Sequence, residues 1–173
     1  VCGRIKSHTN FAGDIQSGLM KMMMIGLGKK DCASLYHRAI HDYGFPRIIH
    51  SVAPQVISND NILCGLAIVE NGCHETAKIE ALLPEDFEAR ETELLAQARQ
   101  WMAKLPFPSI DVLVVDRIGK NISGTGMDTN VIARKHSESW EGGPRIIRIR
   151  VSDLAVNTHG NATRNGFAYF CHS

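Results

Sequence analysis

The chain lacks the features that mark several classes of protein. Its 19 Lys and Arg nearly match its 18 Asp and Glu, and a formal net charge of +1 argues against a general nucleic-acid binder, which needs a concentrated basic face. The longest apolar run, residues 19–27, is interrupted by Lys21 and is too short to span a bilayer. Five cysteines with no Cys-x-x-Cys pair do not make a disulfide scaffold. Since no secretory signal is evident, we expect a cytoplasmic protein without nucleic-acid or membrane partners.

What is present is the composition of a globular protein. Hydrophobic residues make up 44% of the chain and charged residues 21%, which excludes wholesale disorder. The chain starts inside the motif-like stretch VCGRIKSHTNF and stops just after an apolar patch, so we expect a piece of a longer protein. We expect residues 1–173 to form one α/β region, with any subdivision near residues 106–110, where prolines cluster.

Apolar residues at helical spacing predict three helices, over residues 30–43, 47–57 and 85–105. For the first we expect Asp31 as the N-cap and Gly44 just beyond the end. Pro54 weakens the second. The third carries an expected core stripe of Leu94, Ala98, Trp101, Met102 and Leu105, with charges over the rest of its surface.

Apolar or alternating segments predict four strands, over residues 62–69, 76–81, 110–115 and 147–151. The first two are joined by a hairpin turn at 70–73. The third, IDVLVV, is typical of a strand buried on both faces, and the fourth has a basic outer face. Alternating strands and helices predict an α/β fold with a mixed or mostly parallel sheet and flanking helices. In such folds chemistry gathers in loops after strands, which here are residues 6–18, 116–130 and 158–165.

Lys21 is the most unusual residue, because it lies inside the apolar stretch LMKMMMI. A lysine that is desolvated there would have a lowered pKa and would serve as a nucleophile or a covalent anchor. The alternative is a lysine whose stem packs while its ammonium group reaches water. The spacing alone does not decide between them.

Three other patterns are less specific. His37 and His41 lie four residues apart on a predicted helix, where a surface role is favoured over metal chelation. Gly26-x-Gly28 precedes a helix, but Asp31 would repel a phosphate, so a tight turn is favoured over a dinucleotide site. The polar, glycine-containing loop from Lys120 to Asn130 is equally compatible with an anion nest and with a plain connection.

Two long strings, GRIKSHTNFAGDIQSGLMKMMMIGLGKKDCASLYHRA and DVLVVDRIGKNISGTGMD, resemble the lactate racemase superfamily, in particular its LarA-like branch. The resemblance runs over nearly all of the chain and implies part of a longer, two-lobed protein. Characterised members are nickel enzymes that racemise or epimerise 2-hydroxy acids, with a pincer nucleotide attached through a thioamide to a lysine.

The resemblance also implies roles for four residues. Lys21 matches the lysine that anchors the cofactor, and His37, sixteen residues later, matches the histidine that ligates nickel. His8 resembles a catalytic acid/base histidine, and Lys120 resembles a later lysine that contacts cofactor or substrate. A histidine suits the base because its pKa lies near neutrality.

The leading hypothesis is therefore a racemase or epimerase of a 2-hydroxy acid or a related sugar acid. Its expected partner is a small-molecule hydroxy acid. The sequence leaves open whether the protein forms a homo-oligomer. The alternative is a divergent family member that binds a metal or an anionic metabolite without racemase activity. A purely structural or interaction module has less support, because the sequence offers no large exposed apolar patch.

Overall fold

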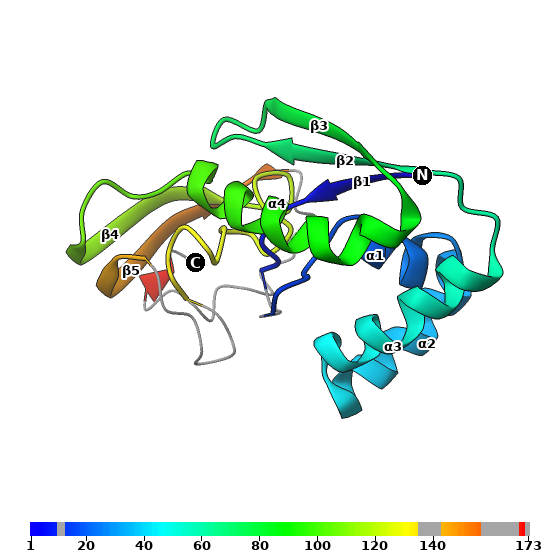
Figure 1. Ribbon diagram of the computed structural model, residues 1–173. Helices are drawn as coiled ribbons and strands as arrows, with labels where there is room; N and C mark the ends of the chain where they lie inside the picture. Colours follow the sequence, from blue (N-terminus) through cyan, green and yellow to red (C-terminus); the bar gives the residue numbers. More distant parts are fainter. Residues whose placement is uncertain (10–12, 135–142, 157–169, 172–173) are drawn as a thin grey trace. The chain divides into compact units, whose positions relative to one another are not determined.

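The computed structural model describes residues 1–9, 13–134, 143–156 and 170–171, and it divides into two units, Val1–Ala103 and Lys104–Ser173 (Figure 1). Each unit combines a small sheet with helices or loops of its own. The expected mixed α/β fold, including parallel strand pairing, is confirmed at this level. Within the described residues, no helix combines the length and the apolar character needed to cross a membrane.

The first unit contains a three-stranded sheet in the order β1-β2-β3, made of β1 (Cys2–Ile5), β2 (Gly65–Glu70) and β3 (Thr76–Leu82). β1 and β2 run parallel, whereas β2 and β3 form the predicted antiparallel hairpin. Asn71 stabilises the turn, since its side-chain oxygen accepts hydrogen bonds from the N–H groups of Cys73 and Glu75.

The described part of this unit also contains five helical segments and one short 3-10 turn, η2 (Pro84–Asp86). They are α1 (Leu19–Lys21), the π-helical turn η1 (Met22–Gly26), α2 (Lys29–Tyr43), α3 (Phe45–Asn59) and α4 (Phe87–Trp101).

Two details of the helix ends differ from expectation. The N-cap of α2 is Gly28, so the prediction of Asp31 was wrong; Asp31 lies in the first turn, where a carboxylate still interacts favourably with the helix dipole. Gly44 follows α2 as predicted, with a φ of 81° that favours glycine, and it also precedes α3. α3 continues through Pro54, because the buried side chains of Ile49 and Ala53 hold it against the core.

α4 packs against β1 and β2 and lies along their sheet in Figure 1. Leu94 and Ala98 are buried as predicted, but the helix ends at Trp101 instead of Leu105, and Trp101 is exposed. Phe87, Leu94, Leu95 and Ala98 meet buried residues of the sheet and of α1 and η1 in one continuous core.

The second unit contains β4 (Ser109–Ile118), β5 (Arg145–Leu154) and β6 (Phe170–Cys171), paired in parallel in the order β4-β5-β6. The prediction that 110–115 is buried on both faces was wrong, since Val112 and Val114 are 57% and 56% exposed. Their partners across the sheet are Arg148 and Arg150, which form the predicted basic outer face. A core of loop and strand residues covers the opposite face: Ile118, Met127, Ile132, Ile146, Ile149 and Val151.

Candidate functional site

Lys21 is held at the junction of α1 and η1 by the apolar residues around it. Leu19, Met20, Met23 and Met24 are all buried, whereas Lys21 is half-buried, with its Nζ 5.9 Å from the centre of the Phe45 ring. Burial lowers the pKa of the Lys21 ammonium, and the positive charge of Lys6 lowers it further. The side chain is therefore more easily deprotonated than an ordinary surface lysine.

Lys6 is placed near Lys21 by its backbone. The N–H of Lys6 donates to Ser17 Oγ over 2.8 Å, and Ser17 Oγ donates to the Lys6 carbonyl over 2.7 Å. Ser17 lies four residues before Lys21, so this pair of bonds ties the stretch after β1 to the start of α1. Among the ion pairs of the described residues, none involves Lys6 or Lys21. Two neighbouring ammonium groups that form no ion pair within the described part of the chain favour an anionic ligand.

The start of α1 depends on a carboxylate from α4. The two oxygens of Glu91 accept hydrogen bonds from the N–H groups of Leu19 and Met20, the latter over 3.1 Å. Glu91 is 1% exposed, and this burial raises its pKa to about 7 despite the two backbone hydrogen bonds, which lower it. Gly18 has a φ of 97°, and a Cβ there would lie 2.8 Å from Glu91 Cδ, so only glycine fits beside the carboxylate.

η1 follows directly after Lys21 and is a π-helical turn, in which Leu27 N–H donates to the Met22 carbonyl over 3.0 Å. Such turns are rare in proteins as a whole, and those that do occur are often found at functional sites. The Gly26-x-Gly28 pattern therefore ends a π-turn and does not follow a strand, which agrees with the tight turn favoured from the sequence. Cys32 occupies the space that a side chain at Gly28 would need.

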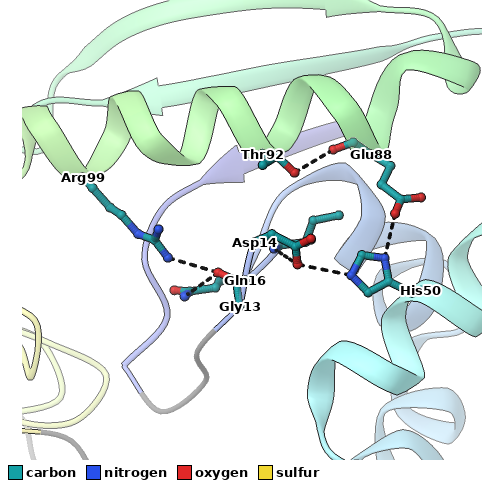
Figure 2. Close-up of polar contacts among 8 residues, drawn as sticks. Gly13, Asp14, Gln16, His50, Glu88, Thr92 and Arg99 are labelled. Atoms are coloured by element: carbon teal, nitrogen blue, oxygen red, sulfur yellow. Dashed lines mark hydrogen bonds and ion pairs between the residues drawn. The ribbon is translucent and has the colours of Figure 1, made fainter. Parts of the chain in front are cut away.

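His8 is half-buried in the stretch after β1, and its backbone is supported by a buried glutamine. Gln16 Oε1 accepts the His8 N–H over 2.8 Å, and Gln16 Nε2 donates to the Gly13 carbonyl over 3.1 Å. Arg99 from α4 donates to the same carbonyl, also over 3.1 Å (Figure 2). The part of residues 6–18 that the structure describes is thus held in place by side chains.

A second polar contact to this stretch involves His50 of α3, which lies between two carboxylates (Figure 2). His50 Nδ1 is 2.8 Å from Glu88 Oε1, and His50 Nε2 is 3.2 Å from Asp14 Oδ1. Sequence analysis did not identify this bridge, because its three members are far apart along the chain.

Sequence analysis also missed Glu91, which it placed among the surface charges of its helix. One signal was available: Phe87, Glu91, Leu94 and Ala98 follow helical spacing, so Glu91 falls within the apolar stripe. Glu88 and Arg99 lie three residues before and eight residues after Glu91. Glu91 and Arg99 bind residues 13–20 directly, and Glu88 binds His50, which contacts Asp14. α4 thus supports the candidate site with a polar stripe.

His37 lies on the exposed side of α2, whose buried residue is Ile40. His41 is exposed too, and its Nδ1 lies 3.1 Å from Asp42 Oδ1. Among the described residues, no group of three or more His, Cys, Asp or Glu side chains is placed to hold a metal ion. A pincer cofactor of the kind implied by the resemblance asks for one histidine ligand from the protein, and His37 is accessible for that role.

Lys120 belongs to the second unit and is exposed in the loop after β4. Several amides of this loop already have partners within it: the N–H groups of Gly119, Ile122, Ser123 and Gly126 donate to carbonyls of the same loop. These bonds favour the plain connection over the anion nest. The third candidate loop, residues 158–165, lies outside the described residues.

The structure thus places His8 and Lys21 on segments joined by the Lys6–Ser17 bonds, His37 on a helix that packs against η1, and Lys120 in the other unit. The half-buried Lys21 amine, the nearby Lys6 ammonium group and the buried Ser7 Oγ, which has no hydrogen-bond partner among the described residues, suit a polar group bound beside this stretch. No protein-family model, no curated protein and no solved structure matches the chain.

Proposed function

We propose that the protein is a racemase or epimerase of a 2-hydroxy acid or a related sugar acid, with a nickel-pincer nucleotide attached to Lys21. The observation that carries the proposal is the half-buried Lys21 amine, whose pKa is lowered by burial and by Lys6. A neutral amine has the lone pair that covalent attachment requires, and a lowered pKa provides that form nearer to neutral pH.

The other residues take roles that agree with their places in the structure. When bound, the pincer nucleotide supplies a carbon that accepts hydride from the substrate Cα. His8 removes the proton of the substrate hydroxyl and returns it, which is work for a group whose pKa lies near neutrality. His37 offers a neutral imidazole to nickel. The proposal also includes a two-lobed, LarA-like protein and a cytoplasmic location. In such a protein Lys120 contacts the cofactor or the substrate.

A second candidate function is favoured by one observation. Lys6 and Lys21 are close enough for one charge to lower the pKa of the other amine, and neither has an ion-pair partner in the described part of the chain. A divergent protein that binds an anionic metabolite without racemase activity would use the same two amines. Such a protein would bind its ligand reversibly and would carry no covalent adduct.

The first experiment measures the intact mass and the nickel content of the protein after co-expression with pincer-synthesis enzymes. We expect an adduct mapped to Lys21 and near-stoichiometric nickel, both lost in Lys21→Ala and Lys21→Arg. Lys30→Ala is the matched control, since Lys30 is an exposed lysine at the start of α2. An unmodified Lys21 without nickel, under conditions that load a known racemase, would overturn the proposal in favour of the second candidate.

A further inference from the structure

The imidazole of His50 lies between two acceptors that come from different parts of the first unit. Asp14 belongs to the stretch before α1 and Glu88 to α4, while His50 itself lies on α3. The two carboxylates meet the ring at opposite nitrogens, at 3.2 Å and 2.8 Å (Figure 2). All three side chains are partly exposed, with His50 the least so at 31%.

This geometry requires a particular state of the ring. A neutral imidazole has one N–H donor and one acceptor nitrogen, whereas an ionised carboxylate only accepts. Only the imidazolium donates to both Asp14 and Glu88 at once. Asp14 is consistent with this: burial works to raise its pKa, but the hydrogen bond from His50, backbone N–H groups and the charge of His50 outweigh that effect and lower it.

Charged groups on α3, α4 and α2 make contacts of their own. On α3, the Arg47 guanidinium lies 5.7 Å from the centre of the Tyr43 ring. On α4, Arg99 donates to the Gly13 carbonyl and so acts on the same stretch without contacting the ring. On α2, which packs against α3, His41 contacts Asp42 of its own helix. Within the described residues, the carboxylates that form ion pairs with His50 are those of Asp14 and Glu88.

The bridge fixes the segment that supports His8. Asp14 is followed by Ile15 and Gln16, which are 1% exposed, and Gln16 accepts the His8 N–H. Releasing Asp14 from His50 would leave Gly13–Gln16 held by Arg99 and by the buried side chains of Ile15 and Gln16. The His8 backbone is thus connected to the His50 ring of α3 through Gln16 and Asp14.

We propose that His50, as an imidazolium bridging Asp14 and Glu88, is a positioning residue for the segment Gly13–Gln16 and, through Gln16, for His8. The importance of His8 in catalysis rests on the proposed function; the bridge and its effect on the backbone do not. An imidazolium makes both hydrogen bonds, whereas a neutral ring donates only one.

The test compares amide hydrogen exchange and histidine ring nitrogen spectra of the full chain with those of His50→Gln under identical conditions. In the wild type we expect two protonated ring nitrogens on His50. The His8 amide should exchange roughly tenfold faster in His50→Gln, the order expected for the loss of one hydrogen bond between charged groups. A glutamine side chain has one amide nitrogen and does not bridge the two carboxylates as the imidazolium does.

Two further variants keep the result interpretable. Glu88→Gln preserves the ring and removes one carboxylate, so we expect an intermediate loss of protection at His8. His41→Gln is the matched control, because it removes an exposed histidine beside a carboxylate and should leave the His8 amide unchanged. Protection of the Leu94 and Leu95 amides reports whether each variant is folded. Exchange at His8 that does not respond to His50→Gln would overturn the proposal, whatever the outcome for the Lys21 adduct.

Discussion

At the scale of single residues, the candidate site depends on where one lysine lies between core and solvent. Lys21 lies between the buried Met20 and the buried Met23, yet its own side chain is only half-buried beside the Phe45 ring. The two interpretations drawn from the sequence, a desolvated amine and a stem that packs below an accessible ammonium group, each describe part of this arrangement. Burial is the larger cause of its lowered pKa, and the charge of Lys6 is the smaller one.

Removing the charge of Lys6 should therefore make Lys21 less reactive. In Lys6→Gln we expect the pKa of Lys21 to rise part of the way toward its ordinary value, because the effect of burial remains. Acylation of Lys21 by an activated ester at pH 8 should slow roughly twofold, as expected for the loss of a nearby charge across solvent. The rate is measured by peptide mass spectrometry.

Lys30→Gln serves as the control for this measurement, since it removes an exposed lysine of α2 and should not change labelling at Lys21. The backbone bonds between Lys6 and Ser17 do not involve the Lys6 side chain, so the variant keeps them. Equal labelling rates in wild type and Lys6→Gln would show that Lys6 has no influence on the amine.

At the scale of elements, the segment that carries Lys21 starts on a carboxylate from α4. Glu91 satisfies two N–H groups at the start of α1 that would otherwise be buried without partners. The cost of this arrangement is a buried carboxyl group, with a pKa raised from 4.5 to about 7. In the unfolded chain the same group is exposed and titrates near its ordinary value.

The sign of the resulting pH dependence follows from linkage. A carboxyl with a raised pKa in the folded state contributes most to stability below pH 4.5, and that contribution is lost as the pH rises to 7. We expect Glu91 to lower the free energy of unfolding by about 3 kcal/mol across this range. Urea denaturation of the wild type at pH 4.5, 5.5, 6.5 and 7.5 measures the loss.

Glu91→Gln provides the comparison, because glutamine keeps the shape of the side chain and does not titrate. Its stability should change less than that of the wild type between pH 4.5 and pH 7. Parallel curves for the two proteins would mean that Glu91 is not buried in the folded state. Glu80 offers an internal contrast, since hydrogen bonds from Arg90 and Lys78 hold its pKa at about 2 and it stays ionised over the whole range.

At the scale of the whole molecule, the candidate site belongs almost entirely to the first unit. Lys6, His8, Lys21 and His37 all lie within Val1–Ala103, as does every residue of the larger core, from Ile5 to Ala98. Lys120 is the one site residue predicted from the sequence that lies in the second unit, which has a smaller core of its own.

Residues 1–103 alone should therefore fold and keep the environment of Lys21. We expect a cooperative thermal transition by circular dichroism and the same pH dependence of Lys21 acylation as in the full chain, because burial and Lys6 both act from within this unit. Residues 104–173 expressed alone provide the comparison. A chain of residues 1–103 that is unfolded, or whose Lys21 labels like an ordinary surface lysine, would contradict this expectation.

Local patterns in the sequence predicted most elements, because helix and strand periodicity depends on near neighbours. The helix at residues 30–43, the hairpin at 70–73 and the return strand after it were found at or close to their predicted places. The exposed outer face of β4 was not predicted, since an apolar run does not reveal which of its faces another segment will cover.

The contacts that support the site were beyond the reach of any local pattern. Glu91 reaches Leu19 across 72 positions, and Arg99 reaches Gly13 across 86. Lys21 itself stood out in the sequence, because a charge in an apolar run is unusual wherever it lies. Its half-burial, the effect of Lys6 and the His50 bridge depend on which distant segments meet, and that follows from the packing of α4 and α3 around the stretch after β1.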